Sequence, residues 1–354
     1  MSGLRSIQDT TMRILAEEIP PGTRVALVDF PNHQNAGDSL IWLGTRKYLQ
    51  QLGVVVDYIA DMSRYDPALL REAVPDGPIL IQGGGNFGDR WTAMQDFRER
   101  VIVDFPDRKI IQLPQSVDFS QGERLRQAQA VLGEHRNLTL LIRDHAGVGR
   151  ARELFGGTTV RFCPDLALGY GLQSPASPPK LDVLMLIRRD DESARHTIEL
   201  RETWTRRETE WSLKGWDLAA WAVLHIPGAV TKRSRFAARK LKSLVEACYQ
   251  SQAEINVRAA TKALSLGRVV VTDRLHASVL GALIGRPVIA LDNETGKVRA
   301  LYEGYLHKLE NLTLAGNGNE VQDRVETILA TADARAALST RNQAASEVGS
   351  GGGF

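Results

Sequence analysis

Short apolar runs rich in Val, Ile and Leu alternate along the chain with stretches of helical period. The runs lie at residues 24–29, 54–56, 78–82, 109–113, 138–144, 160–162, 181–187, 268–272 and 287–291. Strands buried on both faces have such continuous apolar sequences, and helices of roughly 10–15 residues between them indicate parallel crossover units. The pattern therefore predicts an α/β fold with doubly wound parallel sheets.

A stretch rich in Pro and Ser, residues 173–179, separates two groups of these runs. Such composition is typical of a linker, and 354 residues are enough for about two domains. We therefore expect two Rossmann-like domains whose parallel sheets face each other across a substrate cleft. The expected parts are an N-terminal domain at 1–175, a C-terminal domain at 180–317, a helix at 318–346 and a flexible tail at 347–354.

Residues 190–245 fit this pattern least well. They contain four of the six Trp residues, and a basic run follows the last of these. The run consists of Lys232, Arg233, Arg235, Arg239, Lys240 and Lys242. One interpretation is a helical insertion in the C-terminal domain with a solvated basic face. The other is an interfacial surface that contacts an anionic membrane or a lipid-linked substrate.

The composition argues against several classes of protein. A net charge of +2 without a long basic tail gives no basis for nucleic-acid binding. No run of about 18 apolar residues is present, and the first 20 residues lack the apolar core of a signal peptide, so we expect neither a membrane span nor a leader. The two Cys residues fit a reducing cytosol, and the scattered His residues have no metal-ligand spacing, so we predict no catalytic metal.

The apolar run that ends at Thr272 is followed by Arg274 and His276, immediately before a helical pattern. In open α/β sheets, ligands bind beyond the carboxyl ends of the strands. Arg is a fixed cation suited to phosphate or carboxylate, and His can move a proton near neutral pH. The pair therefore predicts a site for an anionic substrate that must be protonated. The alternative for His276 is a structural histidine with satisfied hydrogen bonds.

Polar loops follow the other predicted strands. In the loop 31–38, Asn35 and Asp38 precede a helix expected to start at Ser39, so Asp38 is either its N-cap or a group that binds a hydroxyl. Residues 83–88 match G-x-G-x-x-G, but no acidic residue follows convincingly at a strand end, so a dinucleotide site is only weakly indicated. The alternatives are a tight strand-to-helix turn and glycines that let a ligand approach the backbone.

Further arginines end two of the predicted strands. Arg143 is followed by Asp144, and its alternatives are a surface ion pair with that residue or contact with a ligand. Arg188 and Arg189 end the first strand of the second half. Successive side chains on a strand face opposite ways, so we expect one of these two to point into the cleft.

Together these motifs resemble those of the polysaccharide pyruvyl transferase family. The matching elements, in order, are residues 35–38, 83–89, 113–116, 142–144, 164–167 and 272–277. The resemblance covers roughly residues 25–300 and implies an architecture like that of the GT-B glycosyltransferases. It also implies phosphoenolpyruvate as the donor, whose pyruvate ends as a cyclic ketal on two sugar hydroxyls. The family's Arg-x-His pair falls on Arg274 and His276.

The chemistry of such a transfer suggests roles for the residues. Arg274, Arg143 and Arg188 are expected to bind the phosphate and carboxylate of phosphoenolpyruvate. His276 is the expected general acid at the methylene carbon, and Asp38 is expected to orient or deprotonate the acceptor. The other expected contacts on the acceptor side are Asn35, Gly84, Gly85, Asn86 and Asp89.

We expect no cofactor besides the co-substrate phosphoenolpyruvate. The expected acceptor is a sugar of a polysaccharide or of its lipid-linked precursor, bound by the N-terminal domain, with the donor bound by the C-terminal domain. A role in exopolysaccharide and cell-envelope synthesis predicts a cytoplasmic protein, at the inner face of the cytoplasmic membrane if residues 190–245 contact lipid. Two other functions stay open: a GT-B glycosyltransferase with a nucleotide-sugar donor, and a non-catalytic glycan-binding assembly protein. No oligomeric state is predicted.

Overall fold

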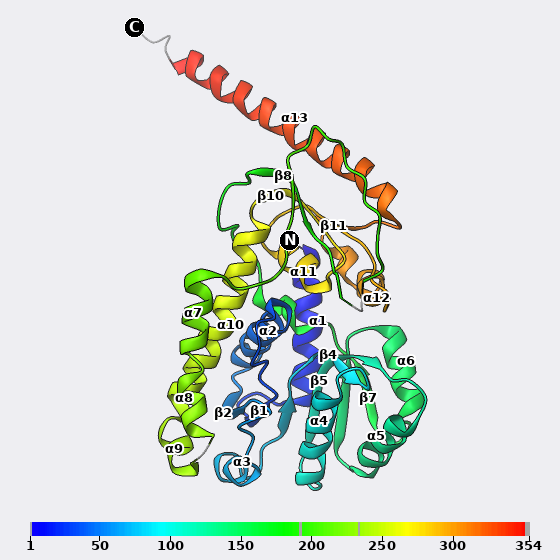
Figure 1. Ribbon diagram of the computed structural model, residues 1–354, viewed down its shortest axis with the longest axis vertical. Helices are drawn as coiled ribbons and strands as arrows, with labels where there is room; N and C mark the ends of the chain where they lie inside the picture. The colour runs from blue at the N-terminus through cyan, green and yellow to red at the C-terminus, as the bar shows by residue number, and fades with distance from the viewer. Residues whose placement is uncertain (1, 191–192, 233, 351–354) are drawn as a thin grey trace. The chain divides into compact units, whose positions relative to one another are not determined.

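The computed structural model describes residues 2–190, 193–232 and 234–350 (Figure 1). Within these ranges the strands form two separate sheets, and all neighbouring strands pair in parallel. The predicted α/β class with two parallel Rossmann-like sheets is therefore confirmed. None of the described helices has the length and apolar sequence needed to cross a bilayer.

The chain divides into two compact units. The first comprises Met1–Gln173, Trp211–Thr261 and Arg299–Glu310, and the second comprises Ser174–Glu210, Lys262–Val298 and Asn311–Phe354. This partition differs from the predicted boundaries, because residues 211–261 were expected in the C-terminal domain. The physical reason is helix α10 (Lys242–Leu264), whose side chains form hydrogen bonds with loops of the first unit. The Tyr249 hydroxyl accepts a hydrogen bond from the backbone N–H of Asp61 at 3.2 Å, and Asn256 Nδ2 donates to the His33 carbonyl at 3.1 Å.

The sheet of the first unit has the strand order β2-β1-β3-β5-β6-β7, with β4 paired to β5 off this path. Its strands are β1 (Arg24–Val28), β2 (Val55–Ala60), β3 (Ile79–Ile81), β4 (Gly84–Gly88), β5 (Ile110–Asp118), β6 (Leu138–Ile142) and β7 (Thr159–Phe162). Strand β2 lies on one side of β1, and the later strands lie on the other. The order therefore reverses between β1 and β3, and doubly wound sheets bind ligands at such a switch point.

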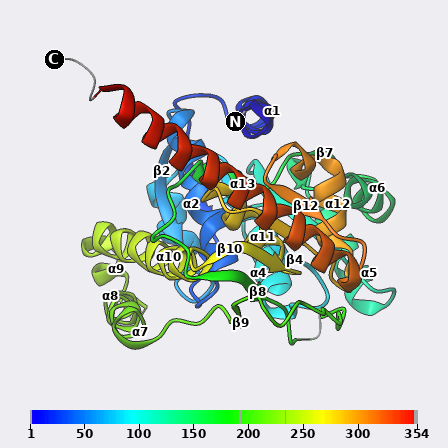
Figure 2. The ribbon, with the colours of Figure 1, turned by 90° about the horizontal axis from the view of Figure 1, so that it is seen from above.

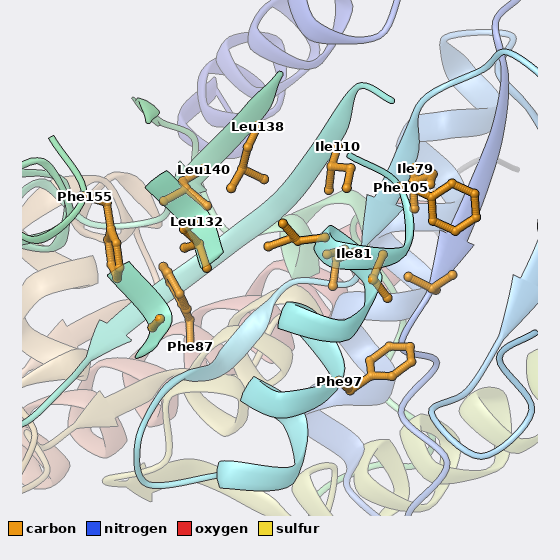
Figure 3. Packing of buried hydrophobic residues seen from close by; sticks show 14 of the residues in the cluster. Ile79, Ile81, Phe87, Phe97, Phe105, Ile110, Leu132, Leu138, Leu140 and Phe155 are labelled. Atoms are coloured by element: carbon orange, nitrogen blue, oxygen red, sulfur yellow. The ribbon is translucent and has the colours of Figure 1, made fainter. Parts of the chain in front are cut away.

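The first unit also contains helices and two 3₁₀ turns. The helices are α1 (Ser2–Glu18), α2 (Ala36–Gln51), α3 (Pro67–Ala73), α4 (Thr92–Asp104), α5 (Glu123–Glu134), α6 (His145–Leu154), α7 (Gly215–Val223), α8 (Ile226–Thr231), α9 (Arg235–Lys240), most of α10 and most of α12 (Lys297–Gly304), and the 3₁₀ turns are η1 (Leu166–Tyr170) and η2 (Leu306–Lys308). Figure 3 shows the core on one face of the sheet, where side chains of the strands meet those of α4 and α5. The rings of Phe87 and Phe155 stack there, with their centroids 5.5 Å apart. Burying an aromatic or aliphatic side chain contributes about 1.5–3 kcal/mol, so this core fixes the strand ends that carry the polar loops.

Of the alternatives for the glycine-rich segment, the tight strand-to-helix turn is wrong, because the segment continues the sheet as β4. A Cβ atom at Gly83 would lie 2.5 Å from the Pro114 carbonyl oxygen, so the backbone approaches β5 more closely than a side chain allows. Gly84 has φ +153°, which L-residues rarely adopt. Helix α4 begins only at Thr92.

The sheet of the second unit has the order β12-β11-β10-β8-β9. Its elements are β8 (Leu181–Leu186), β9 (Arg206–Glu208), β10 (Gly267–Thr272), α11 (Leu275–Leu283), β11 (Val288–Ala290), β12 (Leu312–Leu314) and α13 (Gly318–Ser350). In Figure 2, α13 passes over this sheet, against which its buried Val321, Val325 and Leu329 pack. The strand order reverses between β8 and β10, which makes that point the expected ligand site of this sheet.

The C-terminal helix begins at Gly318, where the sequence predicted it to begin. It continues to Ser350, so residues 347–350, expected as part of a flexible tail, are helical instead. Residues 351–354 of that expected tail lie outside the described residues.

Candidate functional site

A polar pocket of about 210 Å³ lies at the switch point of the first sheet. It is formed by the loops that follow β1, β2 and β3, and its polar lining side chains are Asp29, Asn32, His33, Asp38, Asp61, Ser63, Gln82 and Asn86. A larger pocket of about 720 Å³ lies along α2 and α10, away from these strand ends. We assign the smaller pocket as the candidate site, because it holds converging carboxylates and an imidazole where this fold binds ligands.

Asp29, directly after β1, has an unusual backbone conformation and an unusual carboxyl group. Its φ is +69°, a region that few residues other than Gly, Asn and Asp occupy. Burial raises the pKa of its carboxyl to about 6, although the positive charge of Arg98 acts in the opposite direction. In the sequence, Asp29 is the last residue of the apolar run 24–29, and no motif there marks it as a site residue.

His33 and Asp38 form a hydrogen-bonded pair in the pocket, with 2.8 Å between His33 Nε2 and Asp38 Oδ2. Burial acts to lower the pKa of His33, but the hydrogen bond and the negative charge of Asp38 outweigh it and raise that pKa. The interpretation of Asp38 as an N-cap is wrong. Helix α2 starts at Ala36, and its cap is Asn35, whose Oδ1 accepts hydrogen bonds from the backbone N–H groups of Gly37 and Asp38 at 2.8 and 3.4 Å.

The predicted acceptor residues of the glycine-rich segment lie partly in this pocket. Asn86 lines it, but its Oδ1 is held by Arg98 Nη2 and Gln115 Nε2, each at 2.8 Å. A Cβ at Gly84 would lie 3.8 Å from Asp38 Oδ1, so the backbone there runs beside that carboxylate. Asp89 does not line the pocket, and its Oδ2 accepts a hydrogen bond from the N–H of Ser120 at 2.8 Å.

Arg98 and Gln115 are therefore supporting residues that the sequence analysis missed. Arg98 is fully buried, and its Nε donates to Gln112 Oε1 at 2.6 Å. Gln115 does lie in one of the matched motifs, residues 113–116, which was the available signal. Arg98 lies within α4 and not after a strand, so the search for polar residues at strand ends could not identify it.

Arg143 lies in the first unit and is buried. Its Nη1 pairs with Asp165 Oδ2 at 2.6 Å and its Nε donates to Ser116 Oγ at 2.9 Å. The alternative of a surface ion pair with Asp144 is wrong, because Asp144 caps α6 instead. A Cβ at Gly85 would lie 3.2 Å from Arg143 Nη2, so the absence of a side chain there leaves room for the guanidinium.

The other predicted donor residues lie together at the switch point of the second sheet. Leu186 of β8 pairs with Thr272 of β10, so Arg188 and Arg274 each stand two residues beyond a paired strand end. Both are half-buried. Burial, and then the like charge of Arg188, lower the pKa of Arg274, as expected where two cations are close together. The Arg274 Nε is buried without a hydrogen-bond partner among the described residues.

Arg188 and Arg189 are each held in place by neighbouring carboxylates. The backbone N–H of Arg188 donates to Asp273 Oδ1 at 2.8 Å, and its guanidinium binds Asp190 through two 2.8 Å contacts. Arg189 pairs with Glu208, and its side chain is 66% exposed against 19% for Arg188. The more buried member of the pair is therefore the one beside Arg274.

His276 is the second residue of α11, and Arg274 is the residue at the N-cap position, which makes no side-chain cap. The imidazole is half-buried. The first turn of a helix presents unpaired N–H groups and a positive dipole end, which favour an anion. Two guanidinium groups, a helix N-terminus and an imidazole thus follow the ends of two neighbouring strands, β8 and β10. Among the described residues, no group of three or more His, Cys, Asp and Glu side chains is placed to hold a metal ion.

The family model that matches this chain, and two of the relatives that match it, are described as pyruvyl transferases. The family model for polysaccharide pyruvyl transferase matches residues 35–295. Pyruvyl transferase 1 of Schizosaccharomyces pombe is 33% identical over 298 residues, which is 80% of this chain and 70% of that protein. EpsO of Bacillus subtilis, also named as a pyruvyl transferase, is 28% identical over 288 residues, which is 80% of this chain and 85% of EpsO.

A solved structure also resembles the chain. It is a functionally uncharacterised protein from Klebsiella pneumoniae, with a TM-score of 0.58 and 18% identity, and the match covers 88% of this chain and 98% of that one. At this identity the likeness supports the fold alone.

Proposed function

Because the chain belongs to the polysaccharide pyruvyl transferase family, we propose that its donor is phosphoenolpyruvate and its product a cyclic pyruvate ketal on a sugar. The observation that carries this proposal is the pair of close guanidinium groups, Arg188 and Arg274, at a ligand-binding switch point. Like charges repel, so such a pair favours a ligand with more than one negative group. Phosphoenolpyruvate offers a phosphate and a carboxylate, both of which accept paired hydrogen bonds from Arg.

His276 is the proposed general acid. It gives a proton to the methylene carbon of phosphoenolpyruvate, and the adjacent carbon becomes cationic. One sugar hydroxyl attacks that carbon, and the phosphate then leaves with the electrons of its C–O bond. A second hydroxyl adds to the resulting oxocarbenium ion and loses its proton, which closes the ketal. The imidazole must face the donor carbon, and its position in the first turn of α11 places it next to Arg274, which is proposed to hold the donor.

The pocket of the first unit is the proposed acceptor site. Asp29 and Asp38 provide oxygen atoms that accept hydrogen bonds from sugar hydroxyls, and Asn86 is held in one orientation by its buried partners. The Asp61 carboxylate instead accepts hydrogen bonds from Asn32, Ser63 and Arg64, so it shapes the wall of the pocket. Asp38 with His33 is the proposed base for the attacking hydroxyl. Arg143 and its partner Asp165 are both almost fully buried, whereas Asp190, the partner of Arg188, is half exposed. We therefore assign Arg143 to positioning the backbone at Gly85 rather than to holding the donor.

The test measures phosphate release and the mass of the acceptor after incubation with phosphoenolpyruvate and a sugar. We expect His276→Ala to lose transfer while it stays folded, and Arg188→Ala and Arg274→Ala to need much more donor. Arg189→Ala is the matched control, because its side chain is exposed and paired with Glu208. Near wild-type turnover of His276→Ala would remove the general acid from the proposal. Transfer from a nucleotide sugar but not from phosphoenolpyruvate would refute the donor assignment.

A further inference from the structure

Helices α7, α8 and α9 expose an unusual amount of apolar surface. In the described part of the chain, seven of the eleven large apolar residues that are exposed lie between Trp216 and Leu244. Trp216 is 90% exposed and Phe236 is 69% exposed. Single exposed apolar residues need no explanation, but a cluster of this kind marks an interaction surface.

The exposed residues of α7 form a stripe with helical spacing. Trp216, Ala220 and Val223 are exposed and stand at positions i, i+4 and i+7 of the helix, so they share one face. On another face, Asp217 pairs with Arg258 of α10 at 3.3 Å, and the carbonyl of Trp221 accepts a hydrogen bond from Gln252 at 3.5 Å. Helix α7 therefore attaches to α10 through polar contacts and leaves its apolar stripe in water. Figure 1 shows α7, α8 and α9 following one another along α10.

The charge of this segment identifies the partner. Residues 211–245 contain seven basic residues and one acidic residue, a net charge of +6 in a chain whose total is +2. Arg235 and Arg239 pair with Asp66 and Glu72, which attaches α9 to α3. Lys232 and Lys240 are exposed beside the apolar residues. Exposed Trp and Phe flanked by Lys is the composition of a segment that lies in the interface of an anionic bilayer.

We propose that α7, α8 and α9 bind the surface of a membrane that contains anionic lipid, with Trp216 and Phe236 entering the interface. A second copy of this chain is the less suitable occupant. In a two-fold dimer the same surface meets itself, and two surfaces of net positive charge would then face each other. The proposal does not depend on the proposed function, because lipid binding needs neither donor nor sugar.

The experiment is sedimentation of the full chain with vesicles, without phosphoenolpyruvate or sugar. Vesicles of phosphatidylcholine and phosphatidylglycerol in equal parts are compared with vesicles of phosphatidylcholine alone. We expect binding to the anionic vesicles only. We expect Lys232→Glu and Lys240→Glu each to weaken it by about fivefold or more, and added salt to weaken it further. Trp216→Ala with Phe236→Ala should weaken it by about tenfold.

Matched controls change exposed residues outside the segment. Val103→Ala removes an apolar side chain that is 63% exposed, and Lys180→Glu reverses an exposed lysine. Both should bind vesicles as the wild type does. The tested side chains are exposed, so the variants should fold, and far-ultraviolet circular dichroism checks this. The proposal is overturned if anionic vesicles bind no better than neutral ones, or if control and test variants bind alike. It is also overturned if light scattering shows a dimer that Trp216→Ala dissociates and no vesicle binding.

Discussion

Replacing Asp29 by Asn should stabilise the folded protein at neutral pH while weakening its reaction. The pKa of the Asp29 carboxyl rises from an ordinary 3.8 to about 6, first because the group is buried. Asn has nearly the same shape and also tolerates the φ of +69° found here. The substitution therefore removes the buried charge and changes little else.

The magnitude follows from proton linkage. A carboxyl whose folded-state pKa is raised holds its proton more tightly in the folded state, so its contribution to stability is fully present below about pH 3.8 and is lost as the pH rises through about 6. Each pKa unit corresponds to about 1.4 kcal/mol, so ionised Asp29 costs the folded state about 3 kcal/mol at pH 7. We expect Asp29→Asn to raise the free energy of unfolding by about that amount at pH 7 and by little near pH 4.

Urea unfolding of wild type and Asp29→Asn across this pH range measures the effect. Asp107→Asn is the control, because that residue is exposed, and it should change the free energy of unfolding by less than about 0.5 kcal/mol. Asp29→Ala should be less stable than Asp29→Asn, because Ala is strained at positive φ. Equal stability of wild type and Asp29→Asn at pH 7, or a gain that is just as large at pH 4, refutes the reasoning. Reduced phosphate release by the more stable variant would indicate that the carboxylate is kept for function.

Two other pairs of groups give further predictions. Asp38→Asn should lower the pKa of His33, since the carboxylate at 2.8 Å is what raises it, and a proton NMR titration of the imidazole that shows no change would contradict this. Arg143→Ala should destabilise the fold by about 3–5 kcal/mol, because it leaves the buried Asp165 without its cation. In the same urea assay the exposed Arg189→Ala should cost less than about 1 kcal/mol, and similar losses for the two variants would show that burial of the Arg143 pair does not matter.

Much of the fold could be predicted because the apolar runs are long enough to identify buried strands. The run at 268–272 became β10 (Gly267–Thr272), and the polar residues placed after it do follow a strand end. The predictions that were wrong concern the turns that follow the strands. Asn35 and Asp38 are both good N-cap residues, and only the backbone that starts α2 at Ala36 selects Asn35. The glycines at 83–88 also fit a turn, because the sequence does not show that the backbone at Gly83 lies against Pro114.

The partners of charged residues were also beyond sequence reasoning. Arg143 is adjacent to Asp144 in the chain, yet it pairs with Asp165, which is carried to it by the segment after β7. In the same way, most of α10 belongs to the first unit, because Tyr249 and Asn256 have buried hydrogen-bond partners there. Such choices depend on which side chains the folded sheet brings together, and spacing along the chain carries no information about them.

The two sheets have the same strand order about their switch points but opposite electrostatic character. The first places the carboxylates of Asp29, Asp38 and Asp61 at the pocket between β1 and β3, and the second places Arg188 and Arg274 between β8 and β10. A sugar hydroxyl that must lose a proton needs oxygen acceptors, whereas a donor with phosphate and carboxylate groups needs cations. We therefore propose that one fold used twice binds two different substrates through the residues that follow its strands. This difference in charge, rather than the fold, is our reason for proposing that the first unit binds the acceptor and the second binds the donor.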